Sequence, residues 1–313
     1  MYKFIILFLY LILTMQTGFA YKFAQISDTH IEVGEQKISD SERRLSLSIQ
    51  LLQNAIEDIN NNPEIEFVVL TGDVINNGRS WNLDSAQFIL DKLDKSFFVV
   101  IGNNDFAFPA SGIGISKTTF HTAFSDNEPN ISSGIWFGFP LPDVMILGVD
   151  NINPISGAEV WTKKKLEKIE TLLEEHSEKD IIVLLHYPVT ELDYVSNGEL
   201  LNSAKPFIDL CNNYSVDIIC SGHYHYSETQ QPDILINVVC PALVEFPHEY
   251  LIFDVQEDKI NIQSKRIADG YTTRESEKKM NQKIQKLSYI YNDINEEQIL
   301  KKITFEEVNY GRR

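Results

Sequence analysis

Runs of consecutive apolar residues, each followed at once by a short polar segment, recur along this chain and constrain its fold more than any other feature. Residues 67–70, 97–101 and 181–185 are three such runs, and residues 216–220 are a fourth in which Asp217 is the single polar residue. Strands that are apolar throughout are buried on both faces, as in parallel sheets. The stretches between the runs, such as residues 41–61, repeat apolar side chains at helical spacing. This alternation predicts an α/β protein whose strands are buried between helices.

The polar segments carry the side chains that can bind metal ions or take part in catalysis. In α/β sheets the carboxyl ends of strands meet at one edge, so residues that follow different strands come together in space. Two cations held there need a shared anionic ligand, and Asp73 suits that role because Gly72 lets the backbone approach closely. Oxygen and nitrogen donors without thiolate suit Mn, Fe or Zn and do not select one of them. The segments supply seven such donors: Asp28, His30, Asp73, Asn103, His186, His223 and His225.

A pair of divalent ions at this edge would fit one kind of chemistry. Water bound to such ions ionises near neutral pH, and the pair can hold both the attacking and the leaving oxygen of an in-line displacement. The donor set therefore favours the hydrolysis of a phosphate ester.

The ordered series Asp-x-His, Gly-Asp, Gly-Asn-Asn-Asp, His and Gly-His-x-His, within residues 23–255, resembles the calcineurin-like metallophosphoesterase superfamily. It is most similar to the bacterial cyclic-nucleotide-phosphodiesterase-like members. The resemblance implies an α/β fold, namely a four-layer α/β/β/α sandwich of two mixed sheets. It also implies hydrolysis of a phosphodiester by a hydroxide that bridges two divalent transition-metal ions. The implied ligands are Asp28, His30 and His225 for one ion and Asn103, His186 and His223 for the other, with Asp73 bridging.

One position departs from the family pattern, because Asn104 stands where the family usually has histidine. An asparagine can donate a hydrogen bond to a phosphate oxygen, but it cannot supply a proton near pH 7. His121, in the loop that follows, is the candidate substitute, and Asp105 is expected to orient the loop or a ligand amide. Asn76 occupies the position of the metal-binding tyrosine of the purple acid phosphatase branch, which argues against a tyrosinate-bound ferric ion.

Two other functions fit the same residues. A phosphomonoesterase or nucleotidase would use the same ligands, because the residues that discriminate substrates lie in the loop of residues 106–133 and near Glu191. A metal-binding scaffold without turnover is the alternative from a different class, and Asn104 is the feature that favours it.

The N-terminus has the pattern of a secretory signal. A lysine at position 3 precedes an almost unbroken apolar run, and Gly18 and Ala20 provide small residues for cleavage near Ala20. We expect a signal peptide in residues 1–20, a secreted or periplasmic protein, a catalytic domain in residues 21–271 and a C-terminal helical appendage or tail in residues 272–313. An uncleaved anchor is the alternative, although the run is short for a span of about 20 residues.

The charge and the cysteines narrow the remaining possibilities. A formal net charge of −18 argues against a nucleic-acid duplex or anionic lipid as a partner. It is a mild handicap for an anionic substrate too, so the metal ions would have to attract the expected small phosphate ester. Cys211, Cys220 and Cys240 are expected to be buried thiols, with a bridge between Cys220 and Cys240 as the alternative. Four short strands are predicted to form an antiparallel meander: residues 234–239, 242–246, 250–255 and 260–263.

Overall fold

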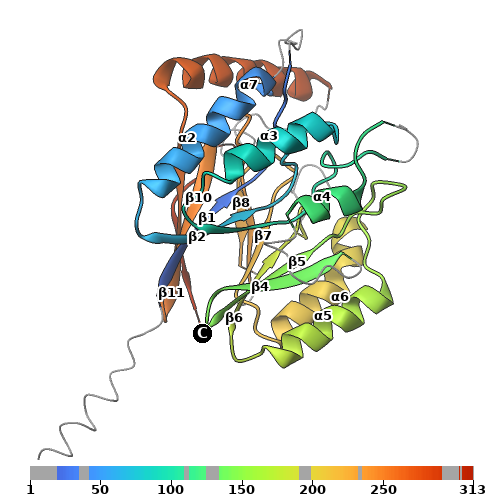
Figure 1. The fold of residues 1–313 in the computed structure, drawn as a ribbon. Helices are drawn as coiled ribbons and strands as arrows, with labels where there is room; N and C mark the ends of the chain where they lie inside the picture. The colour runs from blue at the N-terminus through green and yellow to red at the C-terminus, as the bar shows by residue number, and fades with distance from the viewer. Residues whose placement is uncertain are drawn as a thin grey trace, which may run out of the picture.

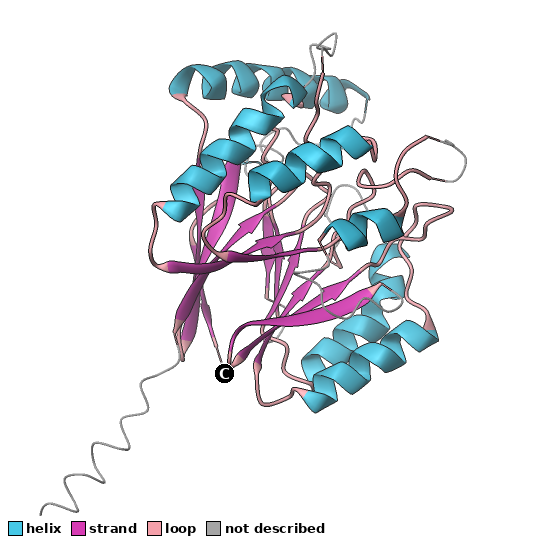
Figure 2. Ribbon diagram, in the orientation of Figure 1, coloured by secondary structure: helices cyan, strands magenta, loops and turns pink. Residues whose placement is uncertain are grey.

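The computed structural model describes residues 20–34, 42–108, 113–124, 134–189, 199–231, 235–290, 303 and 305–312. Nearly all of the expected signal peptide lies outside the described residues. In the part of the chain that the structure describes, no helix is both long and apolar enough to cross a membrane. Two six-stranded sheets pack face to face, and helices cover their outer faces (Figures 1 and 2).

The first sheet combines a parallel half with an antiparallel half. Strands β1 to β3 are parallel, and β10 pairs antiparallel with β1 on the other side. The edge strand β12 pairs with β11, so residues near the C-terminus belong to the same sheet as β1. The order is β12 (Val308–Gly311), β11 (Lys259–Arg266), β10 (Glu249–Val255), β1 (Tyr21–Ile26), β2 (Ile65–Leu70) and β3 (Ser96–Val99).

The second sheet has a parallel centre with an antiparallel strand at each edge. Strands β5, β6, β7 and β9 are parallel, whereas β4 pairs antiparallel with β5 and β8 pairs antiparallel with β9. The order is β4 (Ile135–Leu141), β5 (Val144–Val149), β6 (Asp180–Leu184), β7 (Ile218–Ser221), β9 (Ile236–Val239) and β8 (Glu228–Gln230).

Three apolar layers hold this sandwich together. Helix α2 (Ser48–Asn60) buries Leu52, Ala55 and Ile59 against the first sheet, with α3 (Ser80–Leu90) beside it. The middle layer lies between the sheets, and α5 (Lys163–Glu175) and α6 (Glu199–Asn213) cover the second sheet in the third layer. The expected four-layer α/β/β/α architecture of two mixed sheets is confirmed. Each central strand is indeed buried on both faces, but the other sheet covers one of them.

The remaining helices lie at the margins of the sandwich. A short 3-10 helix, η1 (Leu45–Leu47), precedes α2, and α4 (Lys117–Ala123) follows the loop after β3. Helix α7 (Gly270–Ile290) lies next to α2 in Figure 1 and packs Met280 and Ile284 against Tyr226 and Phe246. The C-terminal residues therefore include a helix packed on the loops after β7 and β9.

The predicted meander is wrong in part. Residues 242–246 form a turn rather than a strand, and β9 pairs in parallel with β7 instead of with β10. The turn is fully buried, and that burial explains why its sequence is as apolar as a strand. Cys211, Cys220 and Cys240 are all buried and free, so the alternative bridge between Cys220 and Cys240 is not formed.

Candidate metal centre

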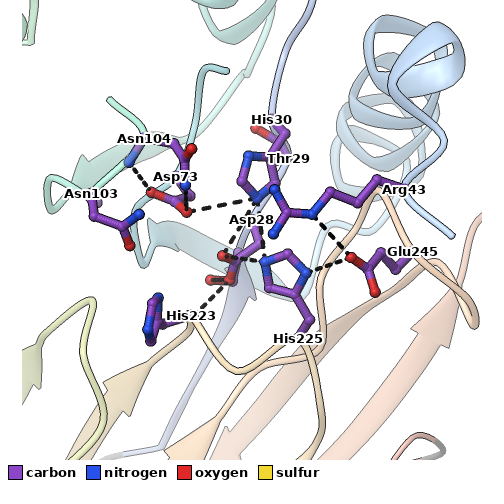
Figure 3. A network of polar contacts seen from close by, with 12 residues as sticks. Asp28, Thr29, His30, Arg43, Asp73, Asn103, Asn104, His223, His225 and Glu245 are labelled. Atoms are coloured by element: carbon purple, nitrogen blue, oxygen red, sulfur yellow. Dashed lines mark hydrogen bonds and ion pairs between the residues drawn. The ribbon is translucent and has the colours of Figure 1, made fainter. Parts of the chain in front are cut away.

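The seven side chains expected to bind metal follow the carboxyl ends of five strands. Asp28 and His30 come after β1, Asp73 after β2 and Asn103 after β3, all in the first sheet. His186 follows β6 in the second sheet, and His223 and His225 follow β7. Because both sheets point these strand ends toward the same region, the structure brings all seven side chains together, many of them visible in Figure 3.

One group of donor atoms comes from the buried side chains of Asp28, His30, Asp73 and His225. His225 Nε2 lies 3.2 Å from Asp28 Oδ1 and 3.3 Å from His30 Nε2. His30 Nε2 lies 3.9 Å from Asp28 Oδ1 and 3.7 Å from Asp73 Oδ2. Ligands at about 2.1 Å from a tetrahedral ion lie about 3.4 Å from one another. The four atoms therefore have the spacing of ligands around one cation.

A second group shares Asp73 with the first. Its donor atoms come from Asp73, His186 and His223 and lie within 4.8 Å of one another. His186 Nε2 is 3.4 Å from Asp73 Oδ1 and 3.1 Å from Asn103 Oδ1. The two oxygens of Asp73 thus face different groups, which is the arrangement that a bridging carboxylate needs.

The donor set fits two divalent ions of the Mn, Fe or Zn type. Asp28 Oδ1 is buried, accepts no hydrogen bond and faces the nitrogens of His30 and His225. A buried carboxylate oxygen in that position is costly unless a cation compensates it. Nitrogen and oxygen donors in both groups, with no thiolate, suit these ions.

Neighbouring groups orient two of the histidines. His186 Nδ1 donates to the carbonyl oxygen of Thr71 at 2.8 Å, and His225 Nδ1 donates to Glu245 Oε1 at 2.7 Å. In each ring the other nitrogen, Nε2, points into the centre. A hydrogen bond of this kind fixes the ring orientation and makes the remaining nitrogen a better ligand.

The four histidines of the centre fall into two classes, one with raised and one with lowered pKa. Burial opposes protonation of His186 and His225, but the charge of Asp73 raises the pKa of His186 to about 9, and the charges of Glu245 and Asp28 raise that of His225 to about 10. Burial lowers the pKa of His30 to about 4 and, together with charged His186, lowers that of His223 to about 3. Without a metal, protons on His186 and His225 therefore offset the buried carboxylates.

Backbone strain is concentrated at the same residues. Of the eight non-glycine residues with positive φ in the described chain, five are candidate ligands: Asp28, His30, Asp73, His223 and His225, with φ between 42° and 70°. Residues other than glycine seldom adopt this conformation, although aspartate and histidine adopt it more often than most, and such backbone is found preferentially at functional sites. The loops are thus shaped to aim side chains at the centre.

Asn104 and Asp105 both act on the loops around Asp73. The backbone N–H of Asn104 donates to Asp73 Oδ1 and its side-chain Nδ2 donates to Asp73 Oδ2, each at 2.7 Å. Asp105 accepts from the N–H of Ile75 at 2.8 Å and of Gly102 at 2.7 Å, so it joins the loops after β2 and β3. Burial, with the charge of Asp73, raises the pKa of Asp105 to about 8.

His121 is not brought to the centre. It lies in the last turn of α4, is buried, and packs its ring against that of Phe120. It belongs to neither group of donor atoms, so the role given to it as a substitute acid stays a prediction.

One residue of the centre was missed by the sequence reasoning. Glu245 is fully buried in the turn after β9, where it accepts from His225 and pairs with Arg43 and with Lys283 of α7. A glutamate inside an apolar run was the available signal, because a carboxylate is almost never fully buried unless it is paired.

Comparisons with known proteins agree with this geometry. Residues 21–227 match the family described as Calcineurin-like phosphoesterase. The chain is 23% identical over 208 residues, 66% of its length, to a protein named "Probable cyclic nucleotide phosphodiesterase" from Ruthia magnifica subsp. Calyptogena magnifica, of which it covers 79%. It is 24% identical over 238 residues, 75% of its length, to "Probable glycerophosphodiester phosphodiesterase GpdQ" from Arcobacter nitrofigilis, of which it covers 81%.

Two solved structures share the fold. A dimetal phosphatase from Danio rerio superposes with a TM-score of 0.60 at 16% identity, over 80% of this chain and 97% of that one. The purple acid phosphatase PPD1 from yellow lupin (Lupinus luteus) gives a TM-score of 0.58 at 14% identity, over 80% of this chain and 52% of that one. These similarities support the α/β/β/α architecture.

Proposed function

The chain belongs to the calcineurin-like phosphoesterase family, and on that premise we propose that it hydrolyses phosphodiesters at a dinuclear metal centre. The observation that carries the proposal is the pair of donor groups that share the carboxylate of Asp73. Asp28, His30 and His225 would hold one ion, and Asn103, His186 and His223 the other. When bound, the ions supply Lewis-acid charge for the phosphoryl oxygens and lower the pKa of water.

Neighbouring residues of the chain hold the candidate ligands in position. Glu245 and the carbonyl of Thr71 hold the rings of His225 and His186 in the orientation that ligation needs. Asn104 holds both oxygens of Asp73 through its backbone and side-chain N–H groups. The five strand ends that supply the ligands are fixed by two hydrogen-bonded sheets, so little reorganisation is needed when a substrate binds.

The names of similar proteins support a diester as substrate, because two of the relatives with a matching sequence carry names of phosphodiesterases. Asn104 cannot protonate a leaving group, and its side chain donates to Asp73. Among diesters, the chain therefore suits those whose leaving group departs without a proton from this position.

Hydrolysis of bis(p-nitrophenyl) phosphate beside p-nitrophenyl phosphate, with Mn²⁺ and protein from Tyr21 onward, tests the proposal. We expect faster cleavage of the diester, and a loss of about a hundredfold or more in Asp73→Ala and His223→Ala. Lys92→Gln, which changes an exposed cation at the far end of α3, is the control for each variant. Faster monoester cleavage would assign the centre to a phosphomonoesterase or nucleotidase. Two bound ions with no turnover of either ester would assign it to a scaffold.

We also propose that residues 1–20 direct export and are removed. The support is the N-terminal sequence itself, together with the start of β1 at Tyr21, so that cleavage near Ala20 leaves every strand complete. Sequencing the N-terminus of protein recovered from the periplasm or medium tests this, and an intact Met1 in that fraction would contradict cleavage.

A further inference from the structure

A cavity of about 420 Å³ adjoins the metal centre on the side of Asn103 and Asn104. These two asparagines belong both to the cavity wall and to the centre, because Asn103 contacts His186 and Asn104 contacts Asp73. The lining also includes Arg79, just before α3, together with Phe106 and Phe108. The volume falls within the range of small-molecule sites, about 300–1,000 Å³. A group attached to a phosphate at the centre would therefore enter this cavity.

The cavity walls are fixed to one another by backbone hydrogen bonds. The N–H of Gly78 donates to the carbonyl of Asn104 at 2.7 Å, and the N–H of Ile115 donates to the carbonyl of Gly78 at 2.8 Å. Gly78 has a φ of +56°, and a Cβ there would lie 2.6 Å from the carbonyl carbon of Phe106. The turn that carries Arg79 is thus packed directly on the backbone of the loop after β3. These contacts hold the residues that line the cavity in fixed positions relative to one another.

Arg79 is a cation without a carboxylate partner among the described residues. Arg43, Arg266 and Arg312 each pair with a carboxylate, whereas the guanidinium of Arg79 lies 5.5 Å from the centre of the half-exposed ring of Trp81. The carbonyl of Arg79 accepts from the N–H groups of Asn82 and Leu83, which fixes the base of the side chain. In a chain with a net charge of −18, an arginine that lines this cavity and has no carboxylate partner among the described residues is a specific attraction for an anion.

The rings of Phe106 and Phe108 give the cavity an apolar side. Their centroids lie 4.8 Å apart at an interplanar angle of 53°, and Phe106 is buried. Asn77 adds a carboxamide, with both a donor and an acceptor, at the rim. A flat aromatic group with polar edges, such as a nucleobase, can pack on the phenylalanine rings and form hydrogen bonds with the carboxamide.

From these contacts we propose that the cavity is a subsite for a nucleotide that carries a second phosphate, with Arg79 binding that phosphate. The inference rests on the proposed function, because the first phosphate is the diester held at the metal centre. Arg79 presents a planar fork that can bind a phosphate through two parallel hydrogen bonds. The preferred substrates are then phosphodiesters with an additional phosphate and an aromatic base, rather than diesters of neutral alcohols.

Turnover of a matched pair of substrates tests the subsite. Thymidylyl-(3′→5′)-thymidine and the same dinucleotide with a terminal 3′-phosphate are compared in the wild type, in Arg79→Gln and in the control Lys92→Gln. Lys92 also lies over an exposed ring, that of Phe88, but at the other end of α3. We expect a higher kcat/KM for the phosphorylated dinucleotide, and a preference reduced about tenfold in Arg79→Gln only. An equal rate for both substrates, or an unchanged preference in Arg79→Gln, overturns the proposal.

Binding of thymidine 3′,5′-bisphosphate to protein without added metal, measured by calorimetry, gives a second readout that does not depend on turnover. Arg79→Gln is expected to weaken the Kd about tenfold, and Lys92→Gln less than about twofold. Equal affinities in all three proteins overturn the subsite. If the wild type hydrolyses no diester yet shows this dependence on Arg79, the proposed function fails and the subsite stands.

Discussion

Asn104 stands where the resemblance leads one to expect a histidine, and it donates two hydrogen bonds to Asp73, one from its backbone N–H and one from its side chain. A carboxylate that must face two cations is easily rotated out of place, because its χ2 torsion is broad. Two donors at 2.7 Å, one on each oxygen, restrict that rotation. Asn104 is therefore a positioning residue for the shared carboxylate.

Replacing Asn104 by alanine should weaken metal binding. The variant keeps the backbone N–H that donates to Asp73 Oδ1 but loses the side-chain donor to Oδ2. Loss of a group that orients a ligand typically costs about 10- to 100-fold in metal affinity. Calorimetric titration with Mn²⁺ measures this, with Asn309→Ala, an exposed asparagine of β12, as control. Equal Mn²⁺ affinities in both variants would contradict the assignment.

Replacing Glu245 by glutamine should lower the pKa of His225 in chelator-treated protein. Glutamine keeps an oxygen that accepts from Nδ1 but removes the charge that, with Asp28, raises this pKa to about 10. Because that value lies above the ordinary 6.5, protonated His225 stabilises the metal-free fold fully below pH 6.5, and the contribution disappears as the pH rises through 10. In Glu245→Gln the loss should occur at a lower pH.

NMR titration of the histidine ring resonances measures this change, with His176 at the end of α5 as internal reference. A His225 pKa that is the same in both proteins would show that Glu245 has no electrostatic role.

At the scale of the elements, the loops after β2 and β3 pack so closely that no side chain larger than a hydrogen atom fits at Gly102. A Cβ on Gly102 would lie 2.1 Å from the backbone nitrogen of Asp73 and 2.3 Å from its Oδ1. The same two loops are tied by Asp105, which accepts from the N–H groups of Gly102 and Ile75. The close approach places Asn103 and Asp73 beside the same histidine, His186.

Gly102→Ala should therefore separate the two loops. We expect a loss of about 1–3 kcal/mol in the free energy of unfolding, as for overpacking, together with weaker Mn²⁺ binding. Gly311→Ala is the matched control, because a Cβ there meets nothing within 4 Å, and its effect should stay within about 0.5 kcal/mol. Urea unfolding of both variants gives the comparison. A Gly102→Ala protein as stable as the control would refute the steric argument.

The position of the centre could be predicted from the order of strands and helices, whereas the residues that hold its ligands in place could not. Asp28, Asp73 and His186 directly follow strands that are recognisable as apolar runs, and parallel strand ends have to meet. The turn that carries Glu245 was not predictable, because burial under α7 makes it as apolar as a strand. The contact of Asn104 with Asp73 depends on how the loops after β2 and β3 lie relative to one another. No local sequence pattern predicts that arrangement.

At the scale of the whole molecule, the centre joins the two sheets. Asp28, His30 and Asp73 come from the first sheet, and His186 and His225 from the second. Arg312, just beyond β12, makes a second link between the sheets through its ion pairs with Asp180 and Asp217 at the starts of β6 and β7. The two links lie at opposite ends of the strands, so the metal centre secures the end at which the loops converge.

Metal binding should consequently stabilise the whole fold. Divalent ions replace the protons of His186 and His225 in compensating the buried carboxylates, and they bind the native arrangement of ligands from both sheets but not the separated chain. At a free ion concentration of about 100 Kd, one site adds about 2.7 kcal/mol. At about 2–4 °C for each kcal/mol in a domain of this size, the Tm should rise by roughly 5–10 °C.

Thermal unfolding with Mn²⁺, and again after excess chelator, measures the shift. Asp73→Ala should lose most of it, because the shared ligand is gone, whereas Asn309→Ala should keep it in full. A Tm that rises equally in Asp73→Ala would mean that the ion stabilises the protein by neutralising its acidic surface, since that effect needs no ligand from either sheet. A shift confined to proteins with Asp73 would instead place the stabilising ion between the sheets.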